Sequence, residues 1–220
     1  MSNRYSRQES IIGTSVLQRS YPLIVGVGAV GREVARVLSA NGISKLAIID
    51  MDTVEEHNCV TQGYHEGDVG KPKVEATSEE ILRINSSIDI LAVNDRWRPT
   101  ETEFDVVFMC VDSLKIRELL FNYYESLDHV KLMLDSRIGG EQIRMLSVFD
   151  DESKTWFPQT LTDDYDAYAT GCHVPMIKHS AHIAAGMLVQ QFVAHLLERE
   201  LFKDRIFALP SGELYNTDEP

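Results

Sequence analysis

The segment from Leu23 to Asp52 constrains the fold of this chain more than any other. It begins with a short apolar run and continues through the motif GVGAVG at residues 26–31. A stretch with helical apolar spacing follows, and a second apolar run then leads into Asp50. This order predicts a strand, a tight turn, a helix and a second strand, the opening unit of a nucleotide-binding α/β fold.

The same segment predicts a nucleotide site at the turn. Glycines let the backbone approach a phosphate, and the N-terminus of the next helix offers that phosphate free N–H groups. Asp50 follows Gly31 by 19 residues, a spacing that suits hydrogen bonds to a ribose. A purely structural glycine turn is the alternative, and the flanking strands and the acid favour the nucleotide. The candidate phosphate contacts are Gly26, Gly28, Ala29 and Gly31.

Composition narrows the class of protein. The chain has 220 residues, 44% of them hydrophobic, and a net charge of −13 that disfavours non-specific binding to nucleic acid. Three scattered cysteines argue against a disulfide framework, and without a CxxC pair no zinc is expected. The polar first residues do not resemble a signal peptide, and no apolar run reaches the ~20 residues that cross a bilayer. We therefore expect a cytoplasmic protein with no membrane partner.

The remaining periodicity predicts strands that alternate with helices. Strands are expected at residues 88–93, 106–111 and 130–134, with an antiparallel strand at 142–149. Helices are expected at residues 73–85, 113–127 and 174–199. The predicted fold class is α/β: a Rossmann-like, doubly wound, mainly parallel sheet with helices on both faces and a late antiparallel extension.

No linker divides the chain, so we expect a single domain over residues 1–220. Residues 1–20 are expected to form an arm with a short amphipathic helix, packed on the body or on a second subunit. Residues 51–70 are polar and contain three glycines, which predicts a long functional loop. An exposed crossing loop is expected at 150–172, and a tail with one short strand at 202–220.

In a doubly wound sheet, ligands bind beyond the carboxyl ends of the strands. That edge gathers the glycine turn and three carboxylates, Asp50, Asp52 and Asp112. Asp135 is a weaker candidate, because its strand lies farther out. Asp112 can hold Mg²⁺ on phosphates or can simply cap the next helix. Lys73 can reach a phosphate or can be an ordinary surface lysine. No cluster suited to hydride transfer is evident, so this residue set favours phosphate chemistry.

Several motifs in a fixed order resemble the ThiF/MoeB/HesA superfamily, the ubiquitin-activating-type adenylating enzymes. The resemblance covers about residues 4–197. The similar stretches are RYSRQ at 4–8, GVGAVG at 26–31, IIDMDTVEEHN at 48–58, DVGKPK at 68–73, and CVDS at 110–113 followed by Arg117. Any one of these motifs alone is weak, but their shared order is specific.

The resemblance implies both a reaction and residue roles. The C-terminal carboxylate of a small ubiquitin-like or sulfur-carrier protein attacks the α-phosphate of MgATP, giving an acyl-adenylate and pyrophosphate. In that pattern Asp50 holds the ribose, Asp112 binds Mg²⁺, and Gly28 approaches the phosphates. Lys73 and Asn58 contact the phosphates as well.

Further implications concern the rest of the triphosphate site. Gln62 ends the segment that Asn58 begins and joins the nucleotide contacts. Arg7 would reach the γ-phosphate end of ATP in a partner subunit, which implies a homodimer. Where relatives carry an arginine on the triphosphate, this chain has Thr61, which lacks a bidentate phosphate ligand. A non-catalytic nucleotide-binding scaffold is therefore one alternative, and an NAD(P)-dependent oxidoreductase is another.

Cysteines and histidines supply the last candidates. In relatives a cysteine near the position of Cys172 takes the activated carrier as a thioester or acyl disulfide, and a helix N-terminus lowers the pKa of a thiol there. An inert thiol is the alternative reading of Cys172. Cys110 lies in an apolar strand and is expected in the core. His179 and His182 share a helix face, where we expect solvated or hydrogen-bonded histidines rather than a metal pair.

Overall fold

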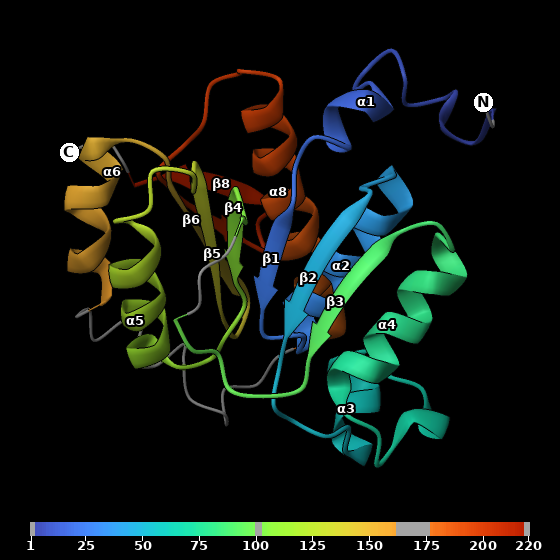
Figure 1. Ribbon diagram of the computed structural model, residues 1–220. Helices are drawn as coiled ribbons and strands as arrows, with labels where there is room; N and C mark the ends of the chain where they lie inside the picture. The colour runs from blue at the N-terminus through green and yellow to red at the C-terminus, as the bar shows by residue number, and fades with distance from the viewer. Residues whose placement is uncertain (1–2, 100–102, 162–176, 218–220) are drawn as a thin grey trace.

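The computed structural model describes residues 3–99, 103–161 and 177–217, built around one sheet of eight strands in the order β3-β2-β1-β4-β5-β6-β7-β8 (Figure 1). Neighbouring strands from β3 to β5 are parallel, and those from β5 to β8 are antiparallel. The predicted α/β class, with its late antiparallel extension, is confirmed. The strands are β1 (Pro22–Val25), β2 (Lys45–Ile49), β3 (Asp89–Val93), β4 (Val106–Met109), β5 (Leu132–Gly139), β6 (Gln142–Val148), β7 (Asp204–Ala208) and β8 (Glu213–Asn216).

Helices cover both faces of the sheet, as doubly wound topology requires. One core packs α1, α2, α4 and α8 against the sheet, and a second core packs α5 and the α6–η3 segment against the opposite face. The helices are η1 (Asn3–Tyr5), α1 (Thr14–Leu17), α2 (Ala29–Asn41), α3 (Glu56–Thr61), η2 (Glu66–Asp68), α4 (Lys73–Ile84), α5 (Leu114–Tyr124), α6 (Asp151–Trp156), η3 (Phe157–Leu161) and α8 (Lys178–Leu196).

The central strands show why helices cover both faces of the sheet. All four residues of β1 are buried, and so are all four of β4. Successive side chains of a strand point to opposite faces. Accordingly, Ile24 joins the core beside α2 and α8, while Leu23 and Val25 join the core beside α5. Continuous apolar strands of this kind have to be covered on both sides.

Three stretches differ from the sequence-based expectations. Residues 51–70 are not one irregular loop, because they contain α3 and η2. The arm at residues 1–20 holds only the short elements η1 and α1 rather than one amphipathic helix. The first part of the crossing segment forms α6 and η3, with Phe157 fully buried. Such elements are too short to show helical periodicity in the sequence.

The C-terminal region contains one more strand than the sequence predicts. Two strands, β7 and β8, replace the single short strand predicted in the tail. In β6, Arg144 binds Asp204 of β7, with Nη2 2.7 Å from Oδ2. Within the described part of the chain, no helix is both long enough and apolar enough to cross a membrane.

Candidate functional site

The glycine turn between β1 and α2 packs tightly against the end of β4. Gly26 has φ +89°, and a Cβ added there would lie 2.5 Å from the carbonyl oxygen of Cys110. A Cβ added to Gly31 would lie 1.9 Å from the carbonyl oxygen of Gly26. Only glycine tolerates such close approaches, so the turn requires glycine at both positions.

The N-terminus of α2 is open at Gly28. Gly28 is the N-cap residue, and no side chain caps the helix there. A Cβ added to Gly28 would have the Gln62 side chain 3.8 Å away. The Oε1 atom of Gln62 is buried and has no hydrogen-bond partner within the described chain. Uncapped N–H groups beside an unpartnered amide are what a bound anion and its attached groups can satisfy.

Asp50 lies at the end of β2 and ties the glycine turn to that strand. Its Oδ2 accepts a hydrogen bond from the N–H of Val27 at 2.8 Å, and its Oδ1 accepts one from the N–H of Asp52 at 2.8 Å. Burial raises the pKa of Asp50, and these two hydrogen bonds work against that rise. A carboxylate has about four lone-pair sites, so acceptor capacity remains for ribose hydroxyls.

Lys73 begins α4 and reaches back to the end of β2. Its Nζ lies 2.9 Å from Oδ2 of Asp52, and its backbone N–H donates to the carbonyl oxygen of Asp52 at 2.9 Å. The Lys73 side chain is 8% exposed, whereas that of Asp52 is 52% exposed. Lys73 is therefore not an ordinary surface lysine, and Asp52 holds its ammonium at the carboxyl end of β2.

The side chains of α3 mostly serve the helix itself. Asn58 is buried, and its Oδ1 accepts a hydrogen bond from the N–H of Glu55 at 2.9 Å. Thr61 donates its hydroxyl to the carbonyl oxygen of His57 at 3.1 Å. The described structure thus places Asn58 at the start of α3 and Gln62 at its C-terminal cap, and Gln62 is the one that faces Gly28.

Asp112 follows β4 and precedes α5. The N–H of Cys110 donates to the carbonyl oxygen of Val25 at 2.8 Å, so the end of β4 lies beside the glycine turn. Asp112 is exposed two residues later. The side chain that caps α5 is Ser113, which accepts from the N–H of Ile116 at 3.4 Å. Ser113 is therefore the N-cap residue of α5.

Asp135 is a structural residue, not a ligand of the nucleotide edge. It is fully buried inside β5, where its Oδ1 lies 2.8 Å from Nε of Arg117 and its Oδ2 lies 2.9 Å from Nε of Arg137. Arg137 also donates to Thr160 of η3 at 2.8 Å. The carboxylate thus joins α5, β5 and η3.

The remaining candidates are an arginine of the N-terminal arm, two cysteines and a histidine. Arg7 is exposed in the N-terminal arm. Cys172 lies outside the described residues. Burial raises the pKa of the Cys110 thiol to about 12, as expected of a core cysteine. His182 is exposed, and its Nδ1 lies 3.0 Å from the carbonyl oxygen of Lys178, as expected of a hydrogen-bonded histidine. Among described residues, no group of three or more His, Cys, Asp or Glu could hold a metal ion.

Sequence reasoning missed the residues behind the glycine turn. The hydroxyl of Tyr64 donates to the carbonyl oxygen of Val27 at 2.6 Å. Arg32 is buried, with its Cζ 4.3 Å from the centroid of the Tyr64 ring, and it donates to the carbonyl oxygen of Gly63. These contacts fasten the Gly63 turn to α2. A charged residue directly after the glycine motif was the available signal, but its partner is distant in sequence.

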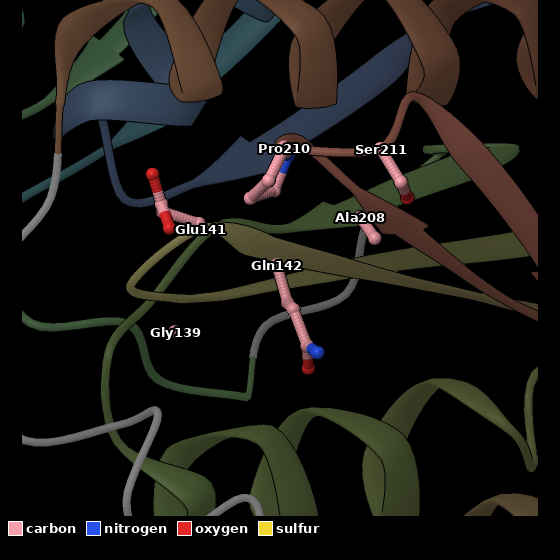
Figure 2. A pocket seen from close by; sticks show the side chains of 6 residues that line it. All are labelled: Gly139, Glu141, Gln142, Ala208, Pro210 and Ser211. Atoms are coloured by element: carbon pink, nitrogen blue, oxygen red, sulfur yellow. The ribbon is translucent and has the colours of Figure 1, made fainter.

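A separate hollow lies in the antiparallel extension (Figure 2). It is formed by the β5–β6 and β7–β8 hairpins, and none of the predicted nucleotide contacts lines it. The lining residues are Gly139, Glu141, Gln142, Ala208, Pro210 and Ser211.

Comparison with known proteins shows the family of this chain. The model of the ThiF family matches residues 5–213. The chain belongs to the ThiF family. A molybdopterin-synthase adenylyltransferase of Haemophilus influenzae is 34% identical over 166 residues, covering 69% of this chain and 66% of that protein. The Escherichia coli protein of the same name is 34% identical over 128 residues, covering 53% of this chain and 51% of that protein. This ThiF chain thus spans from about half to two thirds of these relatives.

Solved structures support the same fold for this ThiF-family chain. The structure of E. coli MccB with ATP covers 99% of this chain and 71% of that chain, with a TM-score of 0.79 and 17% identity. The structure of PaaA covers 97% of this chain and 72% of that chain, with a TM-score of 0.77 and 20% identity. At these identities the likeness concerns the fold.

Proposed function

We propose that this protein uses ATP to adenylate the C-terminal carboxylate of a small ubiquitin-like or sulfur-carrier protein. The observation that carries the proposal is the open N-terminus of α2 at Gly28, with Asp50 and the Asp52–Lys73 pair at the same sheet edge. The relatives that are named adenylyltransferases support it. So does an adenylyltransferase and sulfurtransferase of Yarrowia lipolytica, which is 33% identical over 127 residues.

The described residues fit ATP. The N–H groups at Gly28 would bind the α-phosphate, Asp50 would accept from the ribose, and Lys73 would exchange part of its contact with Asp52 for a phosphate. An oxygen of the carrier carboxylate attacks the α-phosphorus as the bond to pyrophosphate breaks. The N–H groups and the lysine stabilise the charge that develops on the phosphate oxygens.

Mg²⁺ is part of the same proposal, with Asp112 as its protein ligand. Mg²⁺ usually takes one or two carboxylates and completes its shell with waters and substrate phosphates. An exposed carboxylate just past the end of β4 suits that pattern. Bound there, the ion would neutralise phosphate charge.

The proposal extends to assembly and to the other candidates. We infer a cytoplasmic homodimer of single-domain subunits in which the exposed Arg7 acts at the γ-phosphate of the partner subunit's ATP. Cys172 would accept the activated carrier in a later transfer step. Sedimentation analysis that found only monomers at micromolar concentration, with full activity, would contradict the role of Arg7.

Exchange of label between pyrophosphate and ATP tests the activity. We expect exchange only when a carrier with a free C-terminal carboxylate is present, and Asp112→Ala should lower its rate by about 10² or more. Asp95→Ala, a change at an exposed acid on the β3–β4 connection, should leave exchange unchanged. Exchange that survives Asp112→Ala would contradict the assigned metal ligand.

A second candidate function is a non-catalytic nucleotide-binding scaffold. Thr61 motivates it, because its hydroxyl is bonded within α3 and supplies no positive charge to a triphosphate. This alternative predicts ATP binding without pyrophosphate exchange against any carrier. Calorimetric ATP titration together with the exchange assay separates the two functions.

A further inference from the structure

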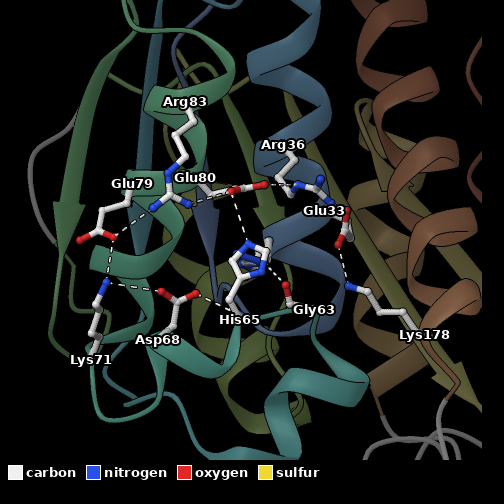
Figure 3. Close-up of polar contacts among 11 residues, drawn as sticks. Glu33, Arg36, Gly63, His65, Asp68, Lys71, Glu79, Glu80, Arg83 and Lys178 are labelled. Atoms are coloured by element: carbon white, nitrogen blue, oxygen red, sulfur yellow. Dashed lines mark hydrogen bonds and ion pairs between the residues drawn. The ribbon is translucent and has the colours of Figure 1, made fainter.

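A network of ion pairs lies around Gly63, the residue that follows Gln62 (Figure 3). Gly63 has φ +72°, and a Cβ added there would lie only 2.0 Å from Nζ of Lys178. The space that a side chain would fill is therefore occupied by the lysine ammonium. Lys178 is the first residue of α8, so this helix delivers a cation to the turn that borders Gly28.

The lysine is held on α2 by a buried carboxylate. Nζ of Lys178 lies 2.6 Å from Oε1 of Glu33, and the side chains of Lys178 and Glu33 are 29% and 4% exposed. Burial alone would raise the pKa of Glu33, but the hydrogen bond and charge of Lys178 hold it below its usual range. Glu33 lies five residues after Gly28, little more than one turn of the same helix. The ammonium thus sits near the positive end of the α2 dipole.

Positive charge at this turn exceeds its local compensation. Lys178 and Arg36 share Glu33, at 2.6 and 2.8 Å, and Nε of Arg36 also lies 3.3 Å from Oε1 of Glu80. Arg32 has no carboxylate partner among the ion pairs of the described residues, and its Nε and Nη2 atoms are buried without a hydrogen-bond partner there. Cations gathered near an open helix N-terminus, with a buried guanidinium left unmatched, favour a negatively charged ligand.

We propose that Lys178 binds the polyphosphate end of ATP, and that Arg32 positions the Gly63 turn for it. This inference rests on the proposed function and adds a phosphate ligand to it. Glu33 holds the Lys178 ammonium at Gly63. When ATP binds, the phosphate replaces Glu33 as the anion nearest to that ammonium. Thr61 supplies no cation, so Lys178 brings the positive charge from α8 instead of α3. A lysine can do this as a point charge on a long stem.

Calorimetric binding of ATP and of AMP to the full chain tests the proposal. Lys178→Met should weaken ATP binding about tenfold and leave AMP binding within about twofold, because AMP lacks the groups that the ammonium contacts. Lys178→Arg should restore most of the ATP affinity. Gly63→Ala, whose added Cβ displaces the ammonium, should reproduce the selective loss. Lys203→Met, at an ion-paired lysine of the β7 approach, is the matched control and should change neither affinity.

Each alternative outcome overturns the inference. If Lys178→Met leaves ATP affinity within twofold of wild type, Lys178 does not contact the phosphates. If the affinities for ATP and AMP fall together, or thermal unfolding shows a lost fold, the residue has a structural role only. Failure of the wild-type chain to bind either nucleotide would instead refute the proposed function.

Discussion

Gly31 and Gly186 both lie inside helices, yet their surroundings give opposite expectations for the same substitution. Gly31→Ala would place a Cβ 1.9 Å from the Gly26 carbonyl oxygen, whereas Gly186 has nothing within 4 Å of an added Cβ. We expect Gly31→Ala to destabilise the protein by roughly 3 kcal/mol through overpacking. Gly186→Ala should stabilise it by about 1 kcal/mol through helix propensity. Urea unfolding measures both, and equal effects would contradict the close packing of the turn.

The ion pair of Glu33 with Lys178 should make the stability of the protein depend on pH. The pKa of Glu33 is lower in the folded protein than the ordinary value of 4.5, so its contribution to stability is present above that value and is lost as pH falls through the folded pKa. Glu33→Gln should cost roughly 1–3 kcal/mol at pH 7 and should flatten the loss of stability as pH falls below the ordinary value of 4.5.

The matched control is Glu79→Gln, at a half-exposed acid paired with Lys71 and Arg83. Because surface pairs contribute little, that variant should keep the wild-type pH profile. Denaturant melts at a series of pH values compare the two variants. If the unfolding free energy of Glu33→Gln falls at acidic pH as much as that of the wild type, the contact with Lys178 does not stabilise the fold.

Single residues also show where sequence reasoning succeeds. The glycine turn was predictable because only glycine permits its backbone angles and close approaches, so the requirement is written locally. The sequence alone does not decide whether Lys73 is a surface or a site residue, because its contact with Asp52 depends on how α4 is placed. It also does not decide whether Asp112 or Ser113 caps α5, and the structure gives that position to Ser113.

At the scale of elements, the buried Asp135 junction holds α5, β5 and η3 together. Asp135→Ala would leave the guanidinium groups of Arg117 and Arg137 buried without their carboxylate. We expect a loss of roughly 3–5 kcal/mol, measured by thermal or urea unfolding. Asp95→Ala, which removes an exposed pair with Arg98, should change stability by less than about 0.5 kcal/mol. Similar small effects from both changes would mean that the junction does not fasten η3.

Elements were predicted well where they are long and periodic. The helix at α2 and the strands β1, β2 and β4 follow apolar patterns that report burial directly. The six-residue helices α3 and α6 span fewer than two turns, so no apolar stripe marks them. Their boundaries depend on caps such as Asp150, which accepts from the N–H of Ser153 at 2.7 Å.

At the scale of the whole molecule, nucleotide binding should stabilise the fold. ATP with Mg²⁺ at about 100 times its Kd should add about 2.7 kcal/mol, which corresponds to a rise in Tm of roughly 5–10 °C for a domain of this size. NAD at the same concentration should cause no shift. Differential scanning fluorimetry distinguishes the outcomes, and stabilisation by NAD but not by ATP would favour the oxidoreductase alternative.

The sequence by itself determined the α/β class, the glycine turn and the acid at the end of β2, because these depend on local backbone requirements and on apolar periodicity. Tertiary structure alone decided which side chains meet. Lys73 joins Asp52 across 21 residues, and Lys178 joins Glu33 across 145 residues. Such pairs arise from strand order and from the packing of α8 on α2, and no local pattern in the chain encodes them.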